Sequence, residues 1–239
     1  MKNIIIPTTI EDDTLTAVKT AVKYATGKNC SIVLMLLQKI PDTYSASHFL
    51  RETSPNYTIA QTKILQKCRE TVATADNCRL IIHNQCGISG PLLKNLMEYL
   101  ATDLVILTPS YKAEKNSLHS YCIQLLLNSK YPLLHLGNNP EENDFNKALY
   151  LEHSKIEFGI NDIQKIISEQ FSFKIVSQAR IEESLEEMAA QITETISKNN
   201  IDILIEARKS TKRSLNRKAQ PVNHNLGLPV LSVYAEAST

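Results

Sequence analysis

A chain of 239 residues is long enough for one large domain or two small ones, and a composition of 43% hydrophobic and 21% charged residues is that of a globular protein. The formal net charge of +1 creates no overall field that would attract nucleic acid or an anionic membrane. The apolar run at residues 4–6 is too short for a secretory signal, and no window approaches the roughly 18 apolar residues of a membrane-spanning helix. We therefore expect a cytoplasmic protein whose cysteines stay reduced.

Strand-like and helix-like segments alternate along the first 136 residues. A short apolar run at 4–8 leads into an acidic turn, where Asp12 or Asp13 is expected to cap a helix at 14–28. The segment at 39–57 is expected to be a loop that holds at most a short helix. Further strands are expected at 31–37, 79–83, 103–107 and 132–136, and further helices at 59–75, 91–101 and 118–128. Such alternation indicates a parallel, doubly wound sheet.

A polar, turn-forming stretch at 137–144 is the clearest boundary in the chain. Beyond it, strands are expected at 148–151, 173–176, 201–205 and 229–233, with helices at 156–169 and 181–198. The two halves share matched anchors in the same order, among them Asp103 and Asp202, and a serine-to-proline spacing of 15 residues occurs in both. These matches predict an internal duplication, with repeat 1 at 1–138 and a shorter repeat 2 at 145–239 that lacks one helix–strand pair.

The order and spacing of these segments resemble the universal stress protein family. Ile5-Ile6-Pro7-Thr8-Thr9 is similar to the end of the family's first strand, and Gly87-Ile88-Ser89-Gly90-Pro91 to the Gly-x-Pro start of a helix. Thr102-Asp103-Leu104-Val105-Ile106 is similar to the fourth strand, and Tyr131-Pro132-Leu133-Leu134 to the last. The resemblance covers 2–136 well and 146–234 loosely. It implies an adenine-nucleotide α-hydrolase-like α/β fold: a doubly wound, mainly parallel five-stranded sheet, duplicated here with a shorter second repeat.

Nucleotide-binding members of that family carry residues that are missing here. An acidic residue ends their first strand, where this chain has Thr9, and a Gly-x-x-Gly stretch and then Gly-Ser follow their fourth strand. The segment at 108–115 has no glycine, and His119-Ser120 retains only the serine. Glycine allows the backbone to approach phosphate closely and to turn its N–H groups onto it, and Pro109 removes one such donor. The corresponding segment of the second half, 207–213, is also free of glycine, so we expect no ATP cofactor.

Three functional hypotheses follow, and they differ in class. The first is a non-catalytic binding or interaction module in stress response, with the two repeats paired within one chain as single-repeat family members pair through their last strands, and with homodimers as a further assembly. The second is a binding protein for a small nucleotide or other anionic metabolite, held in a cleft of repeat 1. That cleft would be lined by Thr8, Thr9, Gln38, Thr108 and Ser120. The third, an enzyme, ranks last because no paired acid and base or partnered nucleophile is evident.

Other chemical patterns in the chain are better explained without a site. Six positive charges fall within residues 208–218, which favours a solvated loop over an anion site, and no aromatic residues interleave there as in a nucleic-acid surface. The spacing of Cys78, His83 and Cys86 does not place three metal ligands on one side of a strand. Neighbouring residues on a helix point in different directions, so His119-Ser120 is no nucleophile–base pair. Asp103 and Asp202 are expected to hold the starts of strands.

Overall fold

The computed structural model describes residues 2–25, 27, 29–42, 45–53, 56–137, 145–153, 160–171, 173–181, 185–208 and 226–234. Its contacts divide the chain into two compact units, Met1–Leu127 and Asn128–Thr239. The division falls ahead of the polar stretch at 137–144, which lies outside the described residues except for Gly137.

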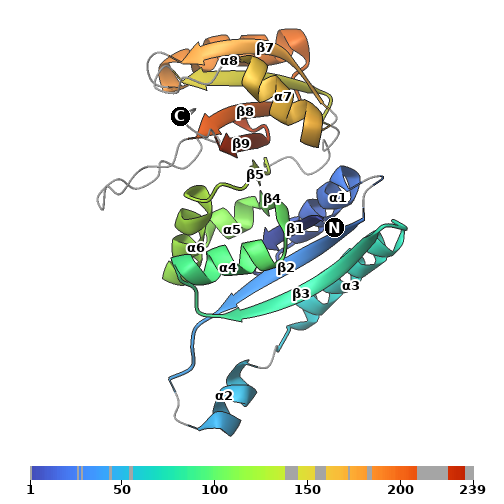
Figure 1. Cartoon of the computed structure of the whole chain (residues 1–239), viewed down its shortest axis with the longest axis vertical. Helices are drawn as coiled ribbons and strands as arrows, with labels where there is room; N and C mark the ends of the chain where they lie inside the picture. Colours follow the sequence, from blue (N-terminus) through green and yellow to red (C-terminus); the bar gives the residue numbers. More distant parts are fainter. Residues whose placement is uncertain are drawn as a thin grey trace. The chain divides into compact units, whose positions relative to one another are not determined.

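The first unit is built on four parallel strands in the order β3-β2-β1-β4 (Figure 1). These strands are β1 (Lys2–Pro7), β2 (Cys30–Gln38), β3 (Cys78–Cys86) and β4 (Thr102–Leu107). The chain winds outward from β1 through β2 to β3 and then returns to place β4 on the other side of β1. The order therefore reverses at β1, and in such sheets the loops at the carboxyl ends of the strands at the reversal form a crevice.

Six helices connect these strands in the described part of the unit. They are α1 (Asp13–Tyr24), α2 (Ala46–Thr53), α3 (Ile59–Ala73), α4 (Gly90–Tyr99), α5 (Pro109–Ala113) and α6 (Ser117–Leu127). Their starts follow local chemistry: α3 begins with a capping box between Thr58 and Gln61, and α4 with Ser89 as N-cap and proline in its first turn. The helices cover the sheet, so that the apolar residues of β2 are buried at eight of nine positions.

The second unit has strands in the order β5-β9-β8-β6-β7. They are β5 (Leu133–His135), β6 (Lys147–His153), β7 (Lys174–Ile181), β8 (Ile203–Arg208) and β9 (Val230–Tyr234), and its described helices are α7 (Ile160–Gln170) and α8 (Leu185–Asn199). The pairs β6–β7, β6–β8 and β8–β9 are parallel, while β5 and β9 are antiparallel. Leu149, Leu204 and Val230 form a core with Ile192 of α8.

The predicted fold class is confirmed: the chain is α/β with mainly parallel strands. Some boundaries were wrong. Ile181 was expected in a helix but ends β7, because that strand continues through alternating polar residues. Residues 109–113, expected as loop, form the short helix α5, and the loop at 39–57 contains α2. Asp202 holds the start of β6, where its Oδ2 accepts hydrogen bonds from the N–H groups of Asn146 and Lys147.

Candidate functional site

The carboxyl end of β1 leads into a tight turn that its own threonine supports. Thr8 is buried, and its Oγ1 lies 2.7 Å from Oγ1 of Thr14 on α1 and accepts a 2.8 Å hydrogen bond from the N–H of Ile10. Ile10 has a φ of 63°, in the left-handed region that β-branched residues rarely adopt. The Thr8 hydroxyl thus stabilises a strained turn that directs the chain from β1 into α1.

The carboxyl end of β4 is organised in the same way by Thr108. This buried residue is the N-cap of α5, where its Oγ1 accepts a 3.3 Å hydrogen bond from the N–H of Tyr111. Its hydroxyl also lies 3.2 Å from the hydroxyl of Ser110.

Asp13 joins the two strand ends. Its Oδ2 accepts a 2.8 Å hydrogen bond from the N–H of Ser110, and its Oδ1 accepts a 2.6 Å bond from the Ser110 hydroxyl. Asp12 is the N-cap of α1, in line with the prediction that Asp12 or Asp13 caps this helix, but its side chain makes no capping bond, and Asp13 reaches α5 instead. Hydrogen bonds to a charged group contribute about 1.5–3 kcal/mol each, so this pair is a substantial link between α1 and α5.

Lys112 of α5 interacts electrostatically with Asp13. Burial lowers the pKa of Lys112 to about 8, and the negative charge of Asp13 opposes that shift by raising it. The lysine is therefore still mostly protonated at neutral pH and loses its charge as the pH rises through about 8.

Behind α5, three side chains of α6 are buried, those of His119, Cys122 and Leu126. The ring of His119 packs edge-on against Tyr111, with ring centroids 5.2 Å apart at 89°. Burial lowers the pKa of His119, although the charge of Glu114 raises it. Burial raises the pKa of Cys122 to about 11, against a hydrogen bond with Tyr111 that lowers it. The imidazole is thus neutral and the thiol protonated at neutral pH, and a protonated thiol is not an activated nucleophile.

Hydrogen bonds place two of the five predicted cleft residues in one network at the strand ends. Ser110 contacts Thr108 and donates to Asp13, and Thr14, which follows Asp13 on α1, contacts Thr8. Neither Asp13 nor Ser110 was predicted as part of the cleft. The acidic turn at 11–13 was visible, but its partner lies 97 residues away and no local pattern indicates it.

The other three predicted residues bond elsewhere. The carbonyl of Thr9 accepts a 3.1 Å bond from the Gln61 side chain at the start of α3. Gln38 ends β2, where its carbonyl accepts a 2.8 Å bond from the N–H of Gly87, and its Oε1 is buried with no hydrogen-bond partner among the described residues. Ser120 is exposed on α6.

In the second unit, Arg208 occupies the carboxyl end of β8. Its guanidinium donates to the carbonyls of Ser232 (2.8 Å), Ser129 (2.9 Å) and Tyr131. Burial raises the pKa of the neighbouring Glu206 to about 6, while a hydrogen bond with Ser232 and the charge of Arg208 lower it. Arg208 was predicted as part of a solvated basic loop. This is wrong for Arg208, because its guanidinium is hydrogen-bonded to backbone carbonyls. The rest of that loop lies outside the described residues.

The described residues contain no group of three or more metal-ligating side chains. Cys78 and Cys86 stand at opposite ends of β3, and His83 lies 3.3 Å from the side-chain oxygen of Gln85. None of the helices in the described part of the chain is both long and apolar enough to cross a bilayer.

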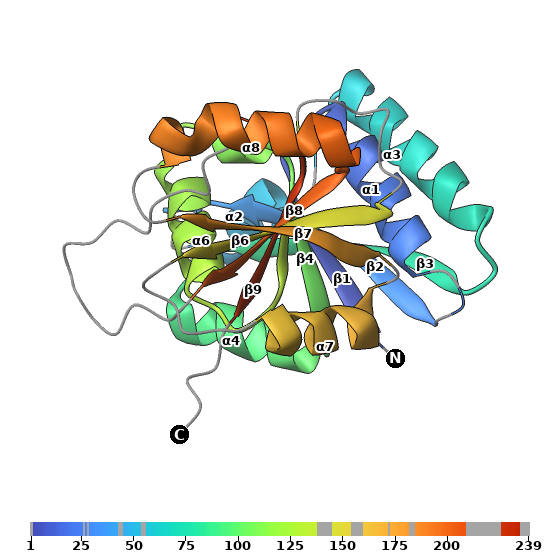
Figure 2. The same ribbon diagram turned by 90° about the horizontal axis from the view of Figure 1, so that it is seen from above.

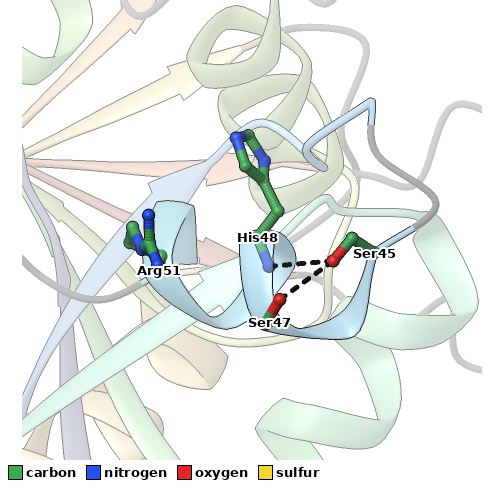
Figure 3. Close-up of a pocket in the computed structure, with 4 residues that line it drawn as sticks. All are labelled: Ser45, Ser47, His48 and Arg51. Atoms are coloured by element: carbon green, nitrogen blue, oxygen red, sulfur yellow. Dashed lines mark hydrogen bonds between the residues drawn. The ribbon is translucent and has the colours of Figure 1, made fainter.

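A surface hollow lies beside α2, lined by Ser45, Ser47, His48 and Arg51 (Figure 3). The hydroxyls of Ser45 and Ser47 are 2.9 Å apart, and Figure 3 shows the imidazole and the guanidinium pointing in different directions. All four residues are exposed and come from one short segment. The hollow therefore lacks the convergent polar groups of a binding site.

No protein-family model and no curated protein matches the chain. Solved structures do match it. A universal stress protein from Archaeoglobus fulgidus DSM 4304 aligns with a TM-score of 0.58 at 10% identity, covering 97% of this chain and 96% of that one. A putative universal stress protein from Pseudomonas aeruginosa UCBPP-PA14 aligns with a TM-score of 0.52 at 12% identity, covering 98% of this chain and 93% of that one. A functionally unknown protein from Pseudomonas aeruginosa PAO1 gives the same score and identity, with 98% and 92% covered. The fold is that of universal stress proteins.

Proposed function

We propose that this chain is a universal stress protein-like module that binds or interacts without catalysis in the cytoplasmic stress response, and that it does not bind ATP. The fold supports the first part of this proposal. One observation carries the second part: the Asp13 carboxylate already bonds the N–H and the hydroxyl of Ser110, just beyond β4.

Ser110 lies in the segment 108–115, which corresponds to the glycine-rich phosphate loop of the nucleotide-binding proteins that the sequence resembles. A phosphate at the same donors would have to displace Asp13 and then lie beside its negative charge. Two unit charges about 4 Å apart repel by roughly 1 kcal/mol in water and about 4 kcal/mol near a protein surface.

The proposal that the chain is not an enzyme rests on the state of its buried groups. Burial raises the pKa of Cys122, so its thiol stays protonated at neutral pH and is not activated as a nucleophile. No ATP turnover is expected.

We propose further that residues 1–138 and 145–239 form the two repeats and that these pair within the chain. The antiparallel register of β5 and β9, with Leu134 opposite Leu231, supports this because these are the last strands of the two repeats. Neither nucleic acid nor a membrane is a proposed partner, since the balanced charge favours neither.

Calorimetric titration of the full chain with magnesium and ATP tests the ATP conclusion. We expect no heat of binding at millimolar nucleotide for the wild type. Asp13→Asn removes the negative charge beside the N–H and hydroxyl of Ser110 and is expected to allow weak ATP binding. Asp12→Asn, at the N-cap position without a side-chain bond, should leave the titration unchanged. Micromolar binding by the wild type would overturn the proposal.

A second function, binding of a small nucleotide or other anionic metabolite in the first repeat, is favoured by Gln38. Its buried Oε1 accepts no hydrogen bond from the residues that the structure describes, and such a group is costly to leave unpaired. A ligand that presents an N–H or O–H to this oxygen would satisfy it. Native mass spectrometry of the purified chain, with Gln38→Leu as the variant, tests this: a bound small molecule lost in the variant would support it, and an unliganded wild-type chain would not.

A further inference from the structure

Each unit ends in a strand with one free side. β3 is the outermost strand of the first unit's sheet, and β7 is the outermost strand of the second. Among the described residues β3 pairs only with β2, and β7 only with β6. Figures 1 and 2 both draw β3 at the margin of its unit with α3 along it. A terminal strand presents a row of N–H and C=O groups that another strand can pair, so proteins usually protect such strands.

β7 carries the usual protection. The pairing register shifts between Ala148 and Leu149 of β6, so that Val176 of β7 has no partner residue on β6. Such a bulge bends and twists an edge strand away from further pairing. The exposed charged residues Lys174 and Arg180 add to this, because charges on an edge disfavour a second strand.

β3 lacks these devices. All nine of its residues pair with β2 without a register shift. Its one charged residue, Arg79, is engaged within the sheet, where Nε donates a 2.6 Å hydrogen bond to the Ser31 hydroxyl. The centre of the strand is Leu80-Ile81-Ile82, which is only half-buried. β3 is therefore long and regular and has an apolar segment at its centre, the kind of edge on which strands assemble.

We infer that β3 pairs with the β3 of a second copy of this chain, antiparallel and about a two-fold axis at Ile82. An antiparallel pair of identical strands is self-complementary and closes as a dimer, since each contact is repeated by the symmetry. Two four-stranded sheets would then continue into one another. Exposed backbone groups on both copies become hydrogen-bonded, and the half-buried apolar centre is covered.

The residues of β3 suit this register. Arg79 would face Gln85 of the partner subunit, so no like charges stand opposite each other. Leu80 would face Asn84 of the partner subunit, and Ile81 would face His83 of the partner subunit. At the two ends, Cys78 would face Cys86 of the partner subunit.

This inference rests on the interaction role in the proposed function and gives the homodimer expected from the sequence a surface. Its failure would leave the conclusion on ATP untouched, because that conclusion depends on Asp13 and Ser110 alone.

The opposed cysteines provide the test. Directly opposite residues of antiparallel strands have Cα atoms roughly 4.5–5.5 Å apart, within the roughly 4.4–6.8 Å that a disulfide spans. Copper phenanthroline is the oxidant, accepting the two electrons released as each pair of thiols forms a disulfide. The full chain is used with Cys30→Ala throughout, because Cys30 neighbours Cys78 on β2 and would compete for it.

We expect oxidation to give a covalent dimer on a non-reducing gel. Cys78→Ser and Cys86→Ser should each abolish the covalent dimer, because in either variant the one remaining cysteine of the pair lies opposite a serine. A mixture of the two variants should restore it, because Cys86 of one copy then faces Cys78 of the other. Crosslinking by either variant alone, or failure of the mixture to crosslink, would overturn the register.

Sedimentation equilibrium provides a second measurement that does not depend on thiols. The wild type should dimerise at concentrations up to about 100 µM, the range expected of a modest interface. Ile82→Lys places two lysines opposite each other and should give monomers, while Val176→Lys on β7 should still dimerise. Circular dichroism checks that the variants are folded. A wild-type monomer throughout, or one that pairs only with an added extended peptide, would refute the dimer.

Discussion

β2 and β7 occupy the same place in their halves, for each follows the first helix and pairs in parallel with the first strand, β1 or β6. Their surroundings differ. β2 is covered on its outer side by β3 and is buried at eight of nine positions, whereas β7 has no such neighbour among the described strands and buries only Ile181. The sequences differ in the same way: β2 (CSIVLMLLQ) is apolar almost throughout, whereas β7 (KIVSQARI) is interrupted by polar residues. The hydrophobic pattern of a strand thus indicates how many neighbouring elements cover it, and this differs between the two units of the chain.

The ends of β4 and β8 provide a second contrast. An anion, Asp13, ties the end of β4 by accepting from Ser110, while a cation, Arg208, ties the end of β8 by donating to carbonyls. Both strand ends are thus held by charged groups of the chain itself. The two units thus stabilise these strand ends with opposite charges.

Alanine substitutions in β2 and β7 should show the largest difference in stability. Leu34→Ala removes a fully buried side chain of β2 and should cost about 3–4 kcal/mol of unfolding free energy. Val176→Ala, on a half-exposed position of β7, should cost under about 1 kcal/mol. Urea unfolding measures both, and equal losses would show that β7 is as well covered as β2.

Removal of the cation at the end of β8 ranks second. Arg208→Ala leaves three carbonyls without their donor and should destabilise the fold by about 3 kcal/mol. Arg180→Ala, on the exposed edge strand, should change stability by no more than about 0.5 kcal/mol. The same unfolding measurement compares them. A small effect at Arg208 would mean that water replaces the guanidinium at little cost.

Removal of the anion at the end of β4 should cost less, about 2 kcal/mol for Asp13→Ala, because Ser110 can turn to water. Asp12→Ala is the matched control and should be nearly neutral. The pKa of Lys112, lowered to about 8 by burial, should fall further once the charge of Asp13 is gone. Amine modification as a function of pH follows this lysine, and an unchanged profile would place Asp13 too far away to act on it.

The smallest effect concerns pH and Glu206. Because its pKa is raised to about 6 in the folded chain, the folded state keeps a proton that the unfolded state releases. Stability should therefore fall by about 1 kcal/mol as pH rises from 4.5 through 6. Glu206→Gln should remove this fall, and unfolding free energies at the two ends of the range test it. A variant with the same pH slope as the wild type would assign the slope to another group.

Much of the fold followed from local patterns. The continuous apolar run of β2 and the three- and four-residue spacing of apolar positions in α1 predicted both elements within a few residues. β7 was predicted too short, because Ser177, Gln178 and Arg180 are polar and an edge strand tolerates them. Its length depends on pairing with β6, which the local pattern does not contain.

The candidate site was less predictable. Thr8 and Thr108 could be found because each directly follows a predicted strand. The role of Asp13 could not be found in this way, because an aspartate at the start of a helix is equally well explained as a helix cap. Its bonds to Ser110 exist only once β1 and β4 lie side by side.

The sequence by itself determined the α/β class, the order of the elements and the lack of glycine beyond β4, because periodicity and backbone freedom are properties of neighbouring residues. The tertiary structure alone decided which charges meet at the strand ends and which edges stay open. Those outcomes depend on residues far apart in the chain that the sheet brings together.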